Sequence, residues 1–306
     1  MSSPLKRLPR LIGLVIAIAC AGFVLWRFAA LLPGIRQVSN GPELLKRISL
    51  SSLIYAAGCL LLAAAWALLL KAFAGSAVPL ASSASLHMRS QIAKYLPGNV
   101  FHLAARHVRA RRLGLGHMNV AAAALAESGI LVLTAIVLSM AIPIERVPAS
   151  LQWLAGWKWL IGVLLSIALV FAHWILRRRF QHDSSFPNLG RSLAFVAGAA
   201  TFYAGFFVLA AAAFRELLND DLGSDVTILP VIALSWLGGF LVVGAPGGIG
   251  VREALLVSML AVQLGEAHAL YAALTFRAVS ILGDVVVFLV GWAMNRIGTG
   301  DLAKPA

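Results

Sequence analysis

Uncharged apolar segments recur along the whole chain, and short charged segments separate them. The clearest examples are residues 48–70 and 192–214. Each is long enough to cross the hydrocarbon core of a bilayer as a helix, which takes about 20 residues. The pattern predicts full membrane helices near residues 11–31, 48–72, 119–142, 157–176, 192–214 and 269–295.

A further hydrophobic region, about residues 82–116, is broken in its middle by the sequence Lys94-Tyr-Leu-Pro-Gly-Asn99. Proline removes a backbone donor and glycine permits turns closed to other residues, so Pro97 and Gly98 end one helix and allow a sharp reversal. Unpaired backbone groups are tolerated at membrane depth only where protein or a water-filled cavity surrounds them. We therefore expect a re-entrant hairpin with its tip inside the protein. The serines and basic residues within 82–90 leave open a position on the cytoplasmic surface instead.

Residues 227–264 are broken in the same manner and predict a second re-entrant hairpin. The break reads Gly244-Ala-Pro-Gly-Gly-Ile-Gly-Val-Arg-Glu253. The residues that we single out at this break are Pro246, Gly247, Gly248, Gly250, Arg252 and Glu253.

The two broken regions occupy equivalent places in two halves of the chain. Pro246 follows Pro97 by 149 residues, and the predicted helix starts pair as 11 with 157, 48 with 192, and 119 with 269. Each half, about 10–142 and 157–295, then contains two helices, a hairpin and a third helix. Because three crossings is an odd number, the second half is inverted, as in many secondary transporters. The alternative is that Pro-Gly pairs recur by chance.

Composition supports one membrane domain over residues 1–306. Hydrophobic residues make up 60% of the chain and charged residues 12%, with a mean hydropathy of +0.89. Soluble domains carry about 25% charged residues. We expect an all-α integral membrane protein with about six full transmembrane helices, two broken hairpins and an inverted 3+3 repeat.

The net charge of +13 does not indicate a nucleic-acid partner, because basic residues gather in the cytoplasmic loops of membrane proteins. Their distribution places both termini and the segments 71–112 and 177–191 in the cytoplasm. No Cys and His spacing is typical of a metal site, and we expect no cofactor.

Several ionisable residues lie in segments predicted to be inside the membrane, where charges are costly and either pair or line a polar cavity. They are Glu127, Arg252, Glu253, Arg277 and Asp284. Glu127 and Arg277 each come early in the third helix of their half, which suggests that both face one central site. One hypothesis is that Arg106, Arg252 and Arg277 hold an anionic phosphate head group, since the arginine fork makes bidentate contacts. The alternative is that these charges form internal salt bridges that hold the hairpins in place.

These residues also resemble a known family. The sequence Lys94-Tyr-Leu-Pro-Gly-Asn-Val, the later Arg106 and Glu127, and Pro246-Gly-Gly-Ile-Gly-Val-Arg-Glu253 are similar to the lysylphosphatidylglycerol synthase transmembrane-region family, over about residues 10–295. The resemblance implies a flippase-type membrane domain, which in multidomain relatives moves aminoacylated phosphatidylglycerol between leaflets. The chain ends about ten residues after the last predicted helix, without the soluble synthase domain, so we expect no enzyme activity.

Three functions follow from these observations. The first is a bacterial inner-membrane flippase or transporter that moves an anionic phospholipid or glycolipid. The second is an accessory subunit that presents lipid to a separate cell-envelope synthesis enzyme. The third is an integral-membrane transferase, which is disfavoured because no nucleophile–base pair, metal cluster or phosphate-binding loop is visible.

Overall fold

The computed structural model describes residues 41–74, 79–95, 101–112, 114–141, 163, 167, 189–218, 228–242 and 246–302. Within these ranges the chain is all-helical and contains no strand, which confirms the predicted fold class at that level. The elements are α2 (Gly41–Ala74), α3 (Leu80–Gln91), η2 (Ile92–Tyr95), α4 (Phe101–Arg112), α5 (His117–Ser139), α7 (Leu189–Leu218), α8 (Ile228–Leu241), η6 (Pro246–Gly248), α9 (Val251–Leu264) and α10 (Glu266–Leu302).

Four of these helices are long and apolar enough to cross a membrane. The spans are Pro42–Ala74 in α2, His117–Ser139 in α5, Leu193–Leu218 in α7 and Glu266–Met294 in α10. They match the helices predicted near 48–72, 119–142, 192–214 and 269–295. The helix predicted near 11–31 lies outside the described residues, and so does the one near 157–176 apart from residues 163 and 167.

The outer surface of the helices is apolar. Leu53, Leu125 and Val262 are exposed over 59%, 70% and 94% of their surface. Apolar exposure on this scale is unfavourable in water, where larger apolar patches mark interaction or membrane surfaces. Together with the four long helices, it indicates a membrane protein.

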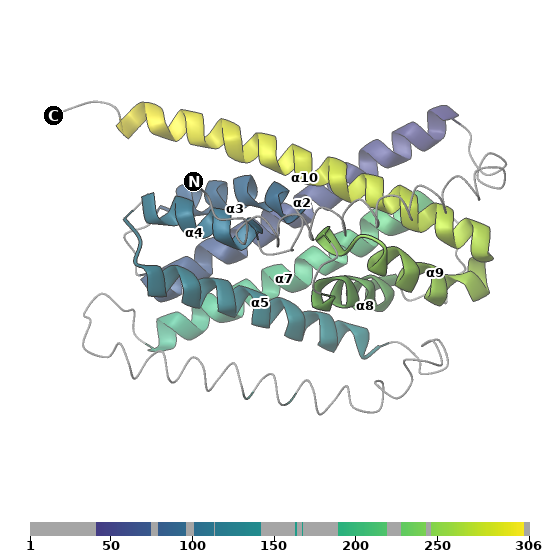
Figure 1. The fold of residues 1–306 in the computed structure, drawn as a ribbon, viewed down its shortest axis with the longest axis horizontal. Coiled ribbons are helices and arrows are strands. Elements are labelled where there is room, and N and C mark those ends of the chain that lie inside the picture. Colours follow the sequence, from purple (N-terminus) through teal and green to yellow (C-terminus); the bar gives the residue numbers. More distant parts are fainter. Residues whose placement is uncertain are drawn as a thin grey trace, which may run out of the picture.

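Helices α2 and α7 run side by side through the centre of the molecule (Figure 1). Small residues permit their close approach: a Cβ on Gly58 would lie 3.3 Å from the Leu209 Cβ, and one on Gly205 would lie 2.9 Å from Leu61. Helices in a membrane associate through such small residues because apolar side chains gain nothing by leaving lipid. Helix α3 packs against α2 of this central pair, and α8 packs against α7.

The two regions predicted to be broken are indeed pairs of short helices. Helices α3 and α4 contact each other, as do α8 and α9. In Figure 1, α3 and α4 lie toward one end of the long helices, whereas α8 and α9 lie toward the other. The short helices η2 and η6, which belong to the two breaks, contact each other between these ends.

The second break follows the expected glycine chemistry, whereas most of the first cannot be described. A Cβ on Gly248 would lie 3.0 Å from the Cα of Gly239 in α8, and φ at Gly248 is +75°. Only glycine fits such a close, left-handed position without strain. Pro97, Gly98 and Asn99 lie outside the described residues.

Candidate functional site

The first group of buried charges joins α3 and α4 to the long helices α2 and α5. Glu127 of α5 accepts hydrogen bonds from Arg106 Nη1 and, on the other carboxylate oxygen, lies 3.0 Å from His87 Nε2. The Arg106 Nε also donates to the Ser90 hydroxyl at 3.3 Å, and the guanidinium lies 4.3 Å from the ring centre of Trp66. Arg106 is only 1% exposed and its charge is matched by Glu127. This group therefore resembles an internal brace more than an open site.

The second group joins η2 to α10 and α2. Asp284, which is 1% exposed, lies 2.7 Å from Lys94 Nζ and accepts a 2.5 Å hydrogen bond from the Tyr95 hydroxyl. The Cys59 thiol of α2 lies 3.8 Å from its other carboxylate oxygen. Lys94 is still 19% exposed along its side chain. Asp284 thus holds η2, which directly follows α3, against α10.

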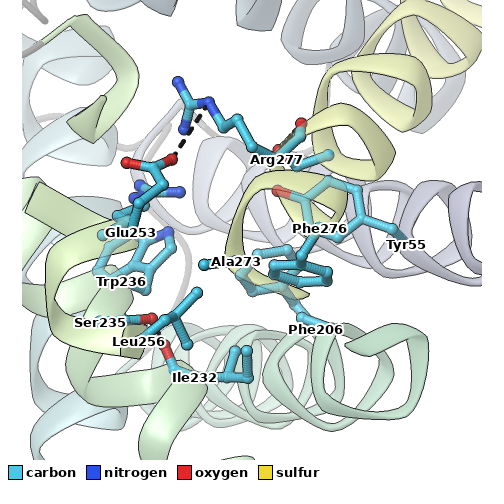
Figure 2. Close-up of a pocket in the computed structure, with 13 residues that line it drawn as sticks. Tyr55, Phe206, Ile232, Ser235, Trp236, Glu253, Leu256, Ala273, Phe276 and Arg277 are labelled. Atoms are coloured by element: carbon cyan, nitrogen blue, oxygen red, sulfur yellow. Dashed lines mark hydrogen bonds and ion pairs between the residues drawn. The ribbon is translucent and has the colours of Figure 1, made fainter. Parts of the chain in front are cut away.

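The third group surrounds a cavity between α2, α7, α8, α9 and α10, shown in Figure 2. The volume that a water molecule can occupy within it is about 30 Å³, which is room for about two water molecules at ~10–15 Å³ each. Aromatic and aliphatic side chains, among them Phe206, Phe276 and Leu256, form one wall. The charged groups that line it are Arg252, Glu253 and Arg277.

Arg277 makes contacts in three directions at one side of this cavity. Its Nη1 donates a 3.0 Å hydrogen bond to the main-chain carbonyl of Gly247 in η6, and its Nε lies 3.7 Å from the Glu253 carboxylate. The same guanidinium lies 5.5 Å from the ring centre of Tyr95 in η2. Figure 2 shows the Arg277 and Glu253 side chains pointing toward each other above the apolar wall. Arg277 therefore contacts both η2 and η6, the short helices that form the tips of the two broken regions.

Glu253 has a second role at the start of α9. Its Oε2 accepts a 2.6 Å hydrogen bond from the backbone N–H of Gly250, which immediately precedes the helix. A carboxylate at the third helical position commonly satisfies this N–H, which has no partner within the helix. Glu253 is thus held both by its own helix and by Arg277.

Arg252 differs from Arg277, the other cation that lines the cavity. Its guanidinium lies 5.8 Å from the ring centre of Trp236, and its Nε is buried without a hydrogen-bond partner. Among the described residues, it has no acidic partner within ion-pair distance. A Cβ on Gly248 would lie 2.7 Å from this Nε, so a glycine at position 248 leaves room for the arginine side chain.

The structure separates residues that the sequence predicted to act together. Arg252 and Arg277 line one cavity, but Arg106 does not line it and is paired with Glu127 instead. Glu127 and Arg277 likewise face different groups rather than one central site. Arg277 and Asp284 share α10, but Arg277 donates its hydrogen bond to η6, whereas Asp284 binds η2.

Several participants were not singled out from the sequence, and they are mostly neutral aromatic or histidine side chains: His87, Tyr95, Trp66 and Trp236. Tyr95 directly follows Lys94 in the first break, which was the available signal. The two tryptophans carried none, because a tryptophan in an apolar helix reads as a packing residue.

No protein-family model matches the chain, and a search of curated proteins finds no match either. In the described part of the chain, no group of three His, Cys, Asp or Glu side chains could hold a metal ion.

Proposed function

We propose that this protein moves a lipid between the two leaflets of a membrane. The observation that carries the proposal is the meeting of η2 and η6 beside a charged cavity. Two broken helix pairs lie toward opposite ends of the long helices and come together there. Discontinuous helices that meet near the bilayer midplane form the substrate site in many secondary transporters.

The proposed architecture is an inverted repeat of residues 10–142 and 157–295, with six full helices and two re-entrant hairpins that enter from opposite sides. The ion pairs support it. In the first half, the second hairpin helix supplies Arg106 and the third full helix supplies Glu127. In the second half, the same places hold Glu253 and Arg277, which follow at 147 and 150 residues with the signs exchanged. Equivalent positions carrying equivalent contacts favour duplication over chance recurrence of Pro-Gly pairs.

The surroundings of the cavity favour an amphiphile as substrate. Its wall combines apolar side chains with arginines, and it lies between helices whose outer faces are apolar. A lipid presents the same combination of a charged head and apolar chains. Membership of the lysylphosphatidylglycerol synthase transmembrane-region family, a bacterial inner-membrane location and cytoplasmic termini belong to the same proposal.

Lipid movement is tested in proteoliposomes that contain fluorescent phosphatidylglycerol or a fluorescent glycolipid. A membrane-impermeant reductant destroys the label in the outer leaflet, so label lost beyond one half of the total measures movement between leaflets. Wild-type protein is expected to increase this loss over protein-free vesicles. If neither lipid moves faster with protein present, transport by the chain alone is wrong, and the accessory-subunit role takes its place.

The contact between the tips gives the matched pair of variants. In Gly247→Ala, the new Cβ lies 3.1 Å from Arg277 Nη2 and 3.3 Å from the Tyr95 ring, and φ is +57°. Gly265→Ala, between α9 and α10, has a similar φ of +77° but no atom within 4 Å. At Gly247 the backbone is left-handed helical (ψ 19°), where alanine costs about 1–2 kcal/mol. At Gly265 (ψ 153°) the conformation is almost restricted to glycine, so alanine costs at least as much, about 1–3 kcal/mol. Only Gly247→Ala crowds the two tips. We expect slower lipid movement in Gly247→Ala than in Gly265→Ala.

A further inference from the structure

Arg252 is a cation of the cavity that no carboxylate among the described residues pairs with. Arg106 pairs with Glu127 and Lys94 pairs with Asp284. Glu253, the carboxylate on the cavity, is shared between the Gly250 N–H and Arg277. Within the described residues, Arg252 contacts only the face of Trp236 as a charge-stabilising group, and its buried Nε donates no hydrogen bond.

The charges around the cavity leave an excess of one positive charge, because two guanidinium groups face one carboxylate. An uncompensated charge in a membrane interior is unfavourable by at least a few kcal/mol. A ligand with one negative charge removes that cost when it binds. The arrangement therefore selects the charge of the ligand.

We propose that Arg252 and Arg277 bind the singly charged phosphodiester of a lipid head group in this cavity. The proposal rests on the lipid-handling function and specifies its substrate class. A guanidinium presents a planar fork that matches phosphate oxygens bidentately. Besides the Arg252 Nε, the Nη2 of Arg277 is buried without a hydrogen-bond partner, so both arginines retain donors for the ligand.

The apolar wall makes a lipid a better occupant than free phosphate. Phe206, Phe276 and Leu256 lie across the cavity from the charged groups (Figure 2), and they offer a water-soluble anion no partner. They suit the glycerol backbone or the first methylenes of an amphiphile. The shared chemistry is the phosphate oxygen, and the experiment below separates the two sources.

The cavity is small in this conformation. Its volume of about 30 Å³ accommodates water but not a phosphodiester. Because Arg252 and Glu253 at the start of α9 line it together with Arg277 of α10, binding requires the start of α9 to move away from α10. Head-group binding is thereby linked to the rearrangement that lipid movement itself needs.

Binding is measured on the full purified chain in an uncharged detergent by the change in thermal unfolding temperature, Tm, on addition of ligand. The probes are phosphatidylglycerol, zwitterionic phosphatidylcholine, an uncharged glycolipid and inorganic phosphate at equal concentrations. A ligand that binds only the native state raises Tm. We expect the largest rise with phosphatidylglycerol.

The decisive variants are Arg252→Gln and Arg252→Lys, with Arg215→Gln as the control for charge, because Arg215 lies exposed on α7. Arg252→Gln is expected to weaken phosphatidylglycerol binding at least about tenfold, as for the loss of a charged hydrogen bond. Arg252→Lys keeps the charge but not the planar fork. Its affinity for phosphatidylglycerol is expected to lie between those of the wild type and Arg252→Gln. Should Arg252→Gln fail to fold, Arg252→Lys still decides the case, since wild-type affinity in it contradicts the bidentate site.

Three outcomes overturn the proposal: an unchanged phosphatidylglycerol response in Arg252→Gln, an equal loss in Arg215→Gln, or an equal Tm rise with inorganic phosphate. The measurement involves no transport, so it fails independently of the function. An Arg252-dependent response without lipid movement in vesicles retains the site and rejects transport. Lipid movement without such a response retains transport and rejects the site.

Discussion

Arg277 on α10 donates a hydrogen bond from Nη1 to the main-chain carbonyl of Gly247, at 3.0 Å. Seven residues further along the same helix, Asp284 holds Lys94 and Tyr95 of the other tip. Seven residues are two helical turns, about 10 Å along the axis. One helix therefore holds both tips side by side, and any movement of either tip must break contacts with α10.

Replacing Arg277 by lysine tests whether the contacts of Arg277 hold η6 against α10. An ammonium carries the same charge but cannot reach the Gly247 carbonyl and Glu253 with a planar fork. We expect a loss of about 1.5–3 kcal/mol in the free energy of unfolding, typical of a charged hydrogen bond, together with altered lipid movement in vesicles. Arg215→Lys on the surface of α7 is the control and is expected to behave as wild type. If the two variants have the same free energy of unfolding and the same lipid movement, the contacts of Arg277 contribute nothing.

The Tyr95 hydroxyl gives a second prediction. Tyr95→Phe retains the ring that faces Arg277 but removes the donor to the buried Asp284 carboxylate. We expect a loss of about 1.5–3 kcal/mol in the free energy of unfolding. Tyr203→Phe is the matched control, because the Tyr203 hydroxyl is buried without a hydrogen-bond partner, so its removal is expected to be neutral or slightly stabilising. A larger loss in Tyr203→Phe than in Tyr95→Phe would contradict the assignment of these hydrogen bonds.

The pairing of Arg106 with Glu127 gives a third. Glu127→Gln leaves a buried guanidinium without its counter-charge, which is expected to reduce the free energy of unfolding by about 3–5 kcal/mol. Glu43→Gln removes one partner of Arg47 at a position where the Glu43 side chain is 53% exposed. Surface pairs contribute only about 0–1 kcal/mol, so this control should unfold almost as the wild type does. Both variants are compared by unfolding in mixed micelles at one pH.

Four of the six predicted long helices, and the division of both broken regions into short helices, could be predicted from the sequence because they depend on properties of single segments. The length of an apolar run decides whether it can cross a membrane. A Pro-Gly pair interrupts a helix wherever it stands. For this reason α8 ends just before the predicted break and α9 begins just after it. These properties do not require any knowledge of which helices become neighbours.

The partners of the charges could not be predicted in this way. Arg277 and Asp284 both fall in the helix predicted near 269–295, but their spacing does not reveal that Arg277 donates its hydrogen bond to η6 whereas Asp284 binds η2. Lys94 and Asp284 lie 190 residues apart in the sequence, and their contact depends on how α3, η2 and α10 pack. Arg106 looked equivalent to Arg252 and Arg277 as a buried arginine. Its ion pair with Glu127 depends on how α4 packs against α5.

Glu253 allows the charge of the proposed lipid site to be changed while its structural contact is retained. In Glu253→Gln, the amide oxygen can still accept the hydrogen bond from the Gly250 N–H that precedes α9. The carboxylate charge disappears, so the excess positive charge at the cavity rises from one to two. We therefore expect tighter binding of phosphatidylglycerol and a shift in preference toward a lipid with a doubly charged phosphate monoester, such as phosphatidic acid. The rise in Tm on adding each lipid, measured relative to each variant's own Tm without lipid, checks this. Weaker binding of both lipids would mean that Glu253 holds Arg277 in place for the ligand, and the site would then depend on the ion pair rather than on net charge.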